Sequence, residues 1–331
     1  MANDSEADGA AGTAGHVVVV IGAGRSGTST LTRGIQALGI ELGNNLKPGT
    51  PKNPKGFFED EELLALNKRL HHAFGLRGTG ASLRLIEEDE WQAAFLNEHM
   101  QTVIAAIQKR FGAFPLWGFK SGGVMRLLPF WEQVFEQLGL KVSYVVAARH
   151  PLAVARSRAK LNALRGVQEK SDLEWLVRVV PYFHLMRRHP FSVVDYDRLM
   201  AEPQIQLRRV AGALNLPLTS DVEREINAFG EQFINPSLQH HRGDANEGAE
   251  RLNPLARDAY RWLHALACDE IAPENPELWR DWARIRSELY AMRHALRHID
   301  FLEDEVERRQ TQGWRRLFAP RSNRISQADS D

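Results

Sequence analysis

The residues with the clearest chemical potential lie in a glycine-rich segment near the start of the chain. It reads GAGRSGTST at residues 22–30 and follows a run of β-branched residues at 17–21. Such an apolar run predicts a strand that is buried on both faces, as parallel strands are. Between a strand of this kind and a helix, free backbone N–H groups and the helix dipole bind anions. The segment therefore predicts an anion cradle made of Gly24, Arg25, Ser26, Gly27, Thr28 and Ser29.

Two nucleotide-binding motifs share part of this pattern. The dinucleotide fingerprint also needs a second strand that ends in an acid about twenty residues further on, and Glu41 has no β-branched strand before it. The phosphate loop of ATPases and GTPases needs a lysine where this chain has Thr28. NAD or FAD binding is therefore disfavoured, whereas a divergent kinase-like phosphotransferase stays open, because Arg25 could supply a different countercharge.

A second candidate anion site follows a predicted strand at residues 142–148. Arg149 ends this strand, Pro151 opens the next helix, and Ser157 follows Arg149 by eight residues. A guanidinium fork and a hydroxyl donor in the first turns of a helix together suit a phosphate dianion. The alternative is that Arg149 and Ser157 form an ordinary surface pair.

The loop and the Arg149–Ser157 pair together resemble the two phosphate-binding motifs of sulfotransferases that use 3′-phosphoadenosine 5′-phosphosulfate. The resemblance covers about residues 16–243. It implies that the loop holds the 5′-phosphosulfate, that Arg149 and Ser157 hold the 3′-phosphate, and that Arg242 closes over it. It also implies an α/β fold, namely a P-loop-like parallel sheet flanked by helices, with an α-helical C-terminal extension.

The resemblance extends to the predicted strand at residues 116–120, whose last residue, Lys120, would contact the phosphosulfate bridge. The chain departs from the family two residues later. Gly122 stands where cytosolic animal enzymes have a catalytic histidine, and many bacterial members carry Lys-Asp-Pro-Arg where this chain has Lys-Ser-Gly-Gly. The general base must therefore come from elsewhere.

Glu59 is the best candidate for that base. It lies in NPKGFFED at residues 53–60, which resembles the proline-rich, glycine-aromatic-glutamate element of bacterial sulfotransferases. The predicted catalytic set is therefore Glu59, Lys120 and Arg25. In the alternative interpretation Glu59 and Asp60 cap the helix that follows.

Histidine pairs provide neither a better base nor a metal site. His71 and His72, like His240 and His241, are more typical of surface or internally satisfied histidines. Adjacent residues do not share a face of a helix or strand, so no metal site is predicted.

Strands alternate with helices from residue 17 to about 216, which predicts a mostly parallel sheet covered on both faces. The segment at residues 39–56 is too rich in Gly, Pro and Asn for regular structure and is a candidate substrate loop. The strands are expected at 17–21, 116–120, 142–148 and 191–195, and the helices at 60–72, 90–111, 126–138, from 151 onward, and at 204–214.

The C-terminal third has a different pattern. Apolar residues from Leu278 to Ile299 recur at alternating spacings of four and three, a heptad seam that could form a homodimer but more often packs on its own domain. The segment at 313–324 has four arginines, three large apolar residues and no acid, so it could touch an anionic membrane surface or a partner, or simply be a solvated end. The predicted divisions are a disordered leader (1–15), the sulfotransferase domain (16–245), a helical extension (246–312) and a basic tail (313–331).

Composition limits the remaining choices. Of 331 residues, 42 are Lys or Arg and 42 are Asp or Glu, which excludes a whole-chain nucleic-acid or membrane-surface binder. Cys268 is the single cysteine, so neither an intrachain disulfide nor a cysteine-built zinc site is expected. The leader lacks the basic start of a secretory signal, and no apolar run approaches membrane-spanning length, which predicts a cytoplasmic protein.

The sequence thus predicts a sulfotransferase, of bacterial type, that moves a sulfuryl group from 3′-phosphoadenosine 5′-phosphosulfate to a hydroxyl of a small molecule or glycan, in particular a carbohydrate or glycolipid. No metal is expected in the reaction. The two alternatives are the kinase-like phosphotransferase and a non-catalytic nucleotide- or glycan-binding protein.

Overall fold

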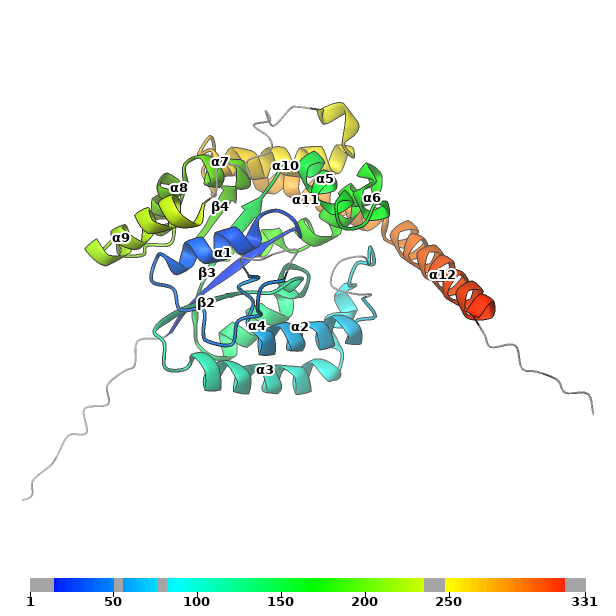
Figure 1. Cartoon of the computed structure of the whole chain (residues 1–331), viewed down its shortest axis with the longest axis horizontal. Coiled ribbons are helices and arrows are strands. Elements are labelled where there is room, and N and C mark those ends of the chain that lie inside the picture. The colour runs from blue at the N-terminus through cyan, green and yellow to red at the C-terminus, as the bar shows by residue number, and fades with distance from the viewer. Residues whose placement is uncertain (1–14, 51–55, 77–81, 235–247, 319–331) are drawn as a thin grey trace, which may run out of the picture.

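Four parallel strands form the centre of the molecule (Figure 1). The computed structural model describes residues 15–50, 56–76, 82–234 and 248–318, with side chains described up to residue 309. Its strands pair in the order β2-β1-β3-β4. Their bounds are β1 His16–Gly22, β2 Leu116–Lys120, β3 Lys141–Ala148 and β4 Phe191–Asp195. The predicted α/β fold with a parallel sheet is confirmed.

Strand β1 is buried on both faces, which is why its sequence is an unbroken β-branched run. Val17 and Val19 face one hydrophobic cluster, and Val18 and Val20 face the other. All four side chains are completely buried. The two-residue alternation of a strand thus supplies one row of valines to each layer of helices.

Helices cover both faces of the sheet. On the side of Val18 lie α1 (Thr28–Gln36), α7 (Tyr196–Ala201), α8 (Pro203–Ala213) and α9 (Ser220–Ala228). On the side of Val17 lie α2 (Glu61–Ala73), α3 (Phe95–Phe111), α4 (Leu128–Gln137), α5 (Pro151–Ala159), α6 (Gln168–Val179), α10 (Pro254–Ala267) and α11 (Pro276–Ala291).

Two predicted helices begin later than expected. The helix predicted at 126–138 is a 3-10 turn, η2 (Val124–Leu127), followed by α4, which has Pro129 in its first turn. Proline fits the first turn of a helix and disrupts its interior, so the α-helix begins here rather than earlier. The helix predicted at 90–111 likewise starts at Phe95, after the 3-10 turn η1 (Glu88–Gln92).

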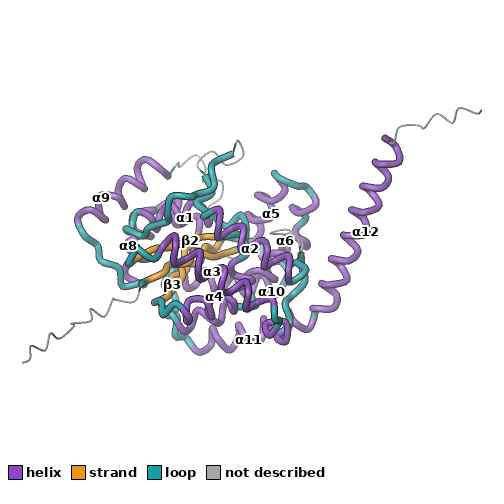
Figure 2. The backbone as a smooth tube through the Cα atoms, turned by 90° about the horizontal axis from the view of Figure 1, so that it is seen from below, coloured by secondary structure: helices purple, strands orange, loops and turns teal. Residues whose placement is uncertain are grey.

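The heptad seam is split between two helices. Helix α11 ends at Ala291, Met292 is its C-terminal cap, and α12 (Arg293–Phe318) begins at the next residue. The part of the seam on α11 packs on its own chain: the Trp282 indole donates to the carbonyl of Val180 at 3.1 Å, and its ring lies 4.3 Å from that of Phe183. Homodimer formation stays a prediction. Helix α12 extends away from the body of the protein (Figure 2).

No described helix is long and apolar enough to span a bilayer.

Trp282 provides a test that the C-terminal helices share the core of the sheet domain. Because the side chain is completely buried, Trp282→Ala should lower the free energy of unfolding by about 3–5 kcal/mol. The exposed Arg280 on the same helix is the control, and Arg280→Ala should change it by less than about 0.5 kcal/mol. Urea denaturation measures both values. Equal, small effects would show that α11 is not part of the core.

Candidate active site

The candidate site lies where the sheet topology changes direction. The chain leaves β1 to form β2 on one side and returns to form β3 on the other. In open α/β sheets, ligands bind at the carboxyl ends of the strands at such a switch point. A cavity of about 190 Å³ is located there, lined by the glycine loop, the end of β2 and the residues that follow it.

The loop between β1 and α1 has a tightly turned backbone. Arg25 and Gly27 both adopt left-handed conformations, with φ of 76° and 84°. A Cβ atom at Gly27 would lie 2.2 Å from Cδ2 of Tyr196, so only glycine fits. For Arg25 this conformation costs on the order of 1–3 kcal/mol, a strain that is found most often at functional sites. The first turn of α1, which starts at Thr28, leaves N–H groups without intrahelical acceptors.

Arg25 joins the loop to the second predicted anion site. Its Nε donates to Oγ of Ser157 at 3.0 Å, while Nη1 of Arg149 donates to the carbonyl of Arg25 at 3.1 Å. The Arg149 guanidinium lies 4.2 Å above the ring of Tyr196. Burial and the nearby charge of Arg149 both lower the pKa of Arg25. Two cations held side by side form a favourable place for an anion.

Lys120 and Glu59 meet on the opposite side of the loop. Nζ of Lys120 donates to Oγ of Ser29 at 3.1 Å and lies 3.4 Å from Oε1 of Glu59. The same Oε1 accepts from the backbone N–H of Gly122 at 3.0 Å. Burial lowers the pKa of Lys120, an effect that the Glu59 carboxylate opposes and the charge of Lys47 adds to. The cavity thus brings together Glu59, Lys120 and Arg25, the three predicted catalytic residues.

The helix-cap alternative for Glu59 is resolved by its neighbour. Oδ1 of Asp60 accepts from the N–H groups of Glu62 and Leu63, both at 3.0 Å, and so caps α2. Oδ2 of Asp60 accepts from Nε of Arg110 at 2.8 Å. Because Asp60 takes the cap position, the Glu59 side chain is available to the cavity.

The described part of the predicted substrate loop lies beside this site. Lys47 donates its backbone N–H to the carbonyl of Glu59 at 2.7 Å, and Leu46 forms an isolated bridge with Asp60. Nζ of Lys47 lies 4.4 Å above the ring of Phe57, which lines the cavity. Binding of substrate by this segment stays a prediction, and residues 51–55 lie outside the described part.

The remaining predicted residues fall into two groups. Arg242, His240 and His241 lie outside the described residues, as do the side chains of the basic tail. His71 is buried against Gly123, where an added Cβ would lie 2.0 Å from its ring. Burial and the charges of two nearby arginines lower the pKa of His71 to about 3, so it is neutral near pH 7. His72 is exposed.

Two residues at the site, Ser121 and Arg178, were missed in the sequence. Ser121 carries a buried hydroxyl with no hydrogen-bond partner within the described parts of the chain, as does Ser26, which was predicted as part of the anion cradle. Arg178, on α6, lines the cavity and is 6% exposed. The Ser121 hydroxyl gave no separate signal in the sequence. Arg178 did give one, because it interrupts the apolar run Leu176 to Val180.

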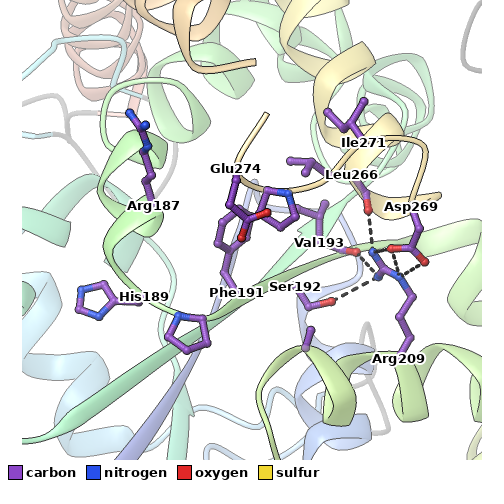
Figure 3. A pocket seen from close by; sticks show the side chains of 13 residues that line it. Arg187, His189, Phe191, Ser192, Val193, Arg209, Leu266, Asp269, Ile271 and Glu274 are labelled. Carbon is purple, nitrogen blue, oxygen red and sulfur yellow. Dashed lines mark hydrogen bonds and ion pairs between the residues drawn. The ribbon is translucent and has the colours of Figure 1, made fainter. Parts of the chain in front are cut away.

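A larger cavity, of about 500 Å³, lies at the opposite edge of the sheet (Figure 3). It opens beside Phe191, the first residue of β4, whereas the candidate site lies at the strands' carboxyl ends. Its most conspicuous charged group is Arg209, which donates to Asp269 at 2.7 Å and to the carbonyls of Val193 at 2.7 Å and Leu266 at 2.6 Å. These bonds tie α8 to β4 and α10, which is a structural role.

Three side chains near the end of α10 are of metal-binding types. The ligand atoms of His264, Cys268 and Glu270 lie within 4.8 Å of one another. The sequence gave no reason to group them, because Cys268 is typical there of a small buried residue. They do not line the candidate site.

The chain is similar to several solved structures, at 15–18% sequence identity. No protein-family model and no curated protein sequence matches the chain. Three of the solved structures that resemble it are sulfotransferases.

One is a sulfotransferase from Mycobacterium tuberculosis H37Rv (15% identity, TM-score 0.39, 68% of this chain and 74% of that one). Another is the sulfotransferase domain of the Synechococcus PCC 7002 olefin synthase (18% identity, TM-score 0.42, 84% of this chain and 95% of that one). A third is a sulfotransferase from Mycobacterium avium (16% identity, TM-score 0.33, 70% of this chain and 69% of that one).

Substitutions at Asp60 and at the neighbouring Glu61 test whether Asp60 caps α2. Asp60→Ala should lower the free energy of unfolding by about 2–4 kcal/mol, because it removes the helix cap and leaves Arg110 without its ion-pair partner. Glu61→Gln, at an exposed position in the same helical turn, should change it by less than about 0.5 kcal/mol. Chemical denaturation compares the two. If the two variants are equally stable, Asp60 is not the cap.

Proposed function

We propose that this protein is a sulfotransferase that moves the sulfuryl group of 3′-phosphoadenosine 5′-phosphosulfate to a hydroxyl acceptor. The observation that carries the proposal is the hydrogen-bonded set Arg25, Arg149 and Ser157 beside the glycine loop, together with the cavity that Arg25 lines with Lys120 and Glu59. This set offers two anion sites and a carboxylate, which are the parts that sulfuryl transfer requires.

The loop side of the cavity suits the 5′-phosphosulfate. Negative charge builds on the departing 5′-phosphate as the S–O bond breaks, so groups that favour this charge lower the barrier. Lys120, the Ser29 hydroxyl and the N–H groups at the start of α1 lie together there. The buried Ser121 hydroxyl lines the same cavity and has no hydrogen-bond partner among the described residues. Such a group is stabilised when a ligand accepts its hydrogen.

The arginine side suits the 3′-phosphate. Nε of Arg149 is buried without a partner among the described residues, and Nη1 is used only on the carbonyl of Arg25. Ser157 is held next to it through Arg25. ATP has no 3′-phosphate, so this second anion site favours the sulfuryl donor over the kinase-like alternative. Thr28 stands where the phosphate loop of ATPases has a lysine. Lys120, at the end of β2, supplies a cation to the site instead.

Glu59 is proposed as the general base. Its Oε1 is held by Gly122 and Lys120, while its Oε2 accepts no hydrogen bond within the described part of the chain. A carboxylate fixed in this way can take the proton of an acceptor hydroxyl as that oxygen attacks sulfur. Gly122, which stands where cytosolic animal sulfotransferases carry a histidine, thus contributes its N–H to orient the base. We propose a carbohydrate or glycolipid hydroxyl as the acceptor.

The donor proposal is tested by calorimetric titration with 3′,5′-bisphosphoadenosine, 5′-AMP and ATP. The bisphosphate should bind more tightly than 5′-AMP by about 2–4 kcal/mol, because only it engages Arg149 and Ser157. Arg149→Ala should remove this difference by weakening the bisphosphate and leaving 5′-AMP unchanged.

The matched control is Arg156→Ala, an exposed arginine on the same helix as Ser157, which should change neither affinity. ATP that binds as tightly as the bisphosphate, with no effect of Arg149→Ala, would overturn the donor assignment and favour the kinase-like function.

The role of Glu59 is tested by Glu59→Gln, with Glu61→Gln as the control. The amide cannot accept a proton, so the rate of transfer from a radiolabelled donor should fall by about 10²–10⁴-fold. Affinity for the bisphosphate should stay within about threefold, since the amide oxygen still accepts from Gly122. Undiminished turnover by Glu59→Gln would show that the base lies elsewhere.

A further inference from the structure

Three side chains of metal-binding types meet at the end of α10, away from the candidate active site. His264 and Cys268 are four residues apart, so they lie on the same face of the helix. Sγ of Cys268 lies 3.7 Å from each ring nitrogen of His264. Glu270 follows two residues later, and the ligand atoms of all three lie within 4.8 Å of one another. An imidazole, a thiol and a carboxylate therefore converge at one partly exposed place.

The backbone after α10 brings Glu270 back to the helix. Cys268 is the C-terminal cap, and Asp269, which follows it, adopts a left-handed conformation with φ of 57°. The N–H of Glu270 then donates to the carbonyl of Ala265 at 2.9 Å, which completes a Schellman motif. Arg209 holds the turn from outside by donating to the Asp269 carboxylate at 2.7 Å (Figure 3). The position of Glu270 beside the helix is thus fixed by its backbone.

Few competing interactions hold the three side chains. The Glu270 carboxylate accepts no hydrogen bond from the part of the chain that the structure describes. Within the same part, the ring nitrogens of His264 contact only the sulfur of Cys268. Burial raises the pKa of the Cys268 thiol, whereas the charge of Arg198 and its hydrogen bond to the sulfur lower it. No ion pair between described residues would break if all three side chains turned toward one metal ion.

The spacing suits a tetrahedral zinc ion. Zinc binds sulfur at about 2.3 Å and imidazole nitrogen at about 2.0–2.1 Å, which places two such ligands about 3.5 Å apart. The separation of Cys268 and His264 is 3.7 Å. Glu270 is exposed, so rotation of its side chain can close the remaining distance, roughly 1 Å at most. Thiolate and imidazole favour zinc over magnesium or calcium, and one thiolate and one carboxylate together balance the double charge of the ion.

From this cluster we propose that His264, Cys268 and Glu270 bind one zinc ion, with water in the fourth position. The thiol releases its proton to solvent as the sulfur binds the metal. The site uses a single cysteine, so it differs from the cysteine-built zinc sites that the composition excludes. It lies outside the cavity of the proposed transfer reaction and does not depend on that function. The ion joins the end of α10 to the segment that leads into α11.

The test uses cobalt(II) as a spectroscopic substitute for zinc, with the intact chain and its thiol kept reduced. Because Cys268 is the single cysteine, a thiolate-to-cobalt charge-transfer band in the near ultraviolet can come only from this residue. One equivalent of cobalt should produce the band, and one equivalent of zinc should remove it, because zinc binds such sites more tightly. Magnesium should do neither. Cobalt that binds without this band, or does not bind, would overturn the proposal.

Three conservative variants assign the ligands. Cys268→Ser should abolish the cobalt band. His264→Gln and Glu270→Gln should each weaken zinc binding at least about tenfold, measured by competition with a chromophoric chelator. Glu277→Gln, at an exposed acid in the first turn of α11, is the control and should leave the affinity unchanged. Folded His264→Gln and Glu270→Gln proteins that keep the wild-type affinity would contradict the proposed ligand set.

Zinc should also stabilise the folded chain, because the three ligands are brought together only by folding. At a hundredfold excess over its Kd, zinc should raise the Tm of the wild type by about 3 °C or more. The Tm of Cys268→Ser should not respond. Equal rises in both proteins would show that zinc acts at another place and would count against the site.

Discussion

The candidate site depends on one buried ion pair, between Lys120 and Glu59. These side chains come from segments about sixty residues apart and meet because β1 and β2 pair in parallel, with Val20 opposite Lys120. That register places Lys120 level with the start of the glycine loop, where it reaches Ser29. Keeping a lysine charged at such depth needs a nearby carboxylate, and Asp60 makes Glu59 available by taking the cap of α2.

Positive charge is otherwise in excess throughout the site. Arg25 lies beside Arg149, and Lys47 acts on Lys120. Each of these arrangements raises the free energy of the protein when no anion is near. An anionic donor would lower it, so charge that destabilises the fold becomes affinity for the ligand. The left-handed backbone conformation of Arg25 also raises the free energy of the folded protein, and it lies in the same site.

Much of this architecture could be predicted from local sequence. Strands β2 and β4 begin and end at the predicted residues, since apolar β-branched or aromatic runs bounded by turns specify buried strands. The loop and the Arg149–Ser157 pair were also recognisable, because each is a short motif. The apolar pattern predicted α4 but placed its start at residue 126, whereas the helix begins at Leu128, with Pro129 in its first turn.

What could not be predicted depends on contacts between distant segments. The bond from Arg25 to Ser157 spans 132 positions, and nothing in either motif requires it. The choice between Glu59 and Asp60 as the cap depends on Arg110, which holds Asp60 from α3. The heptad pattern predicted one continuous seam through Met292, because the spacing of apolar residues does not reveal that one helix ends there and another begins.

The central claim is that one nucleotide bridges the glycine loop and the Arg149–Ser157 pair. A crystal structure of the complex with 3′,5′-bisphosphoadenosine tests this most directly. We predict the 5′-phosphate against residues 24–29 and Lys120, and the 3′-phosphate between Arg149 and Ser157. A nucleotide bound with its 3′-phosphate away from Arg149, or bound outside the switch point of the sheet, would contradict the account.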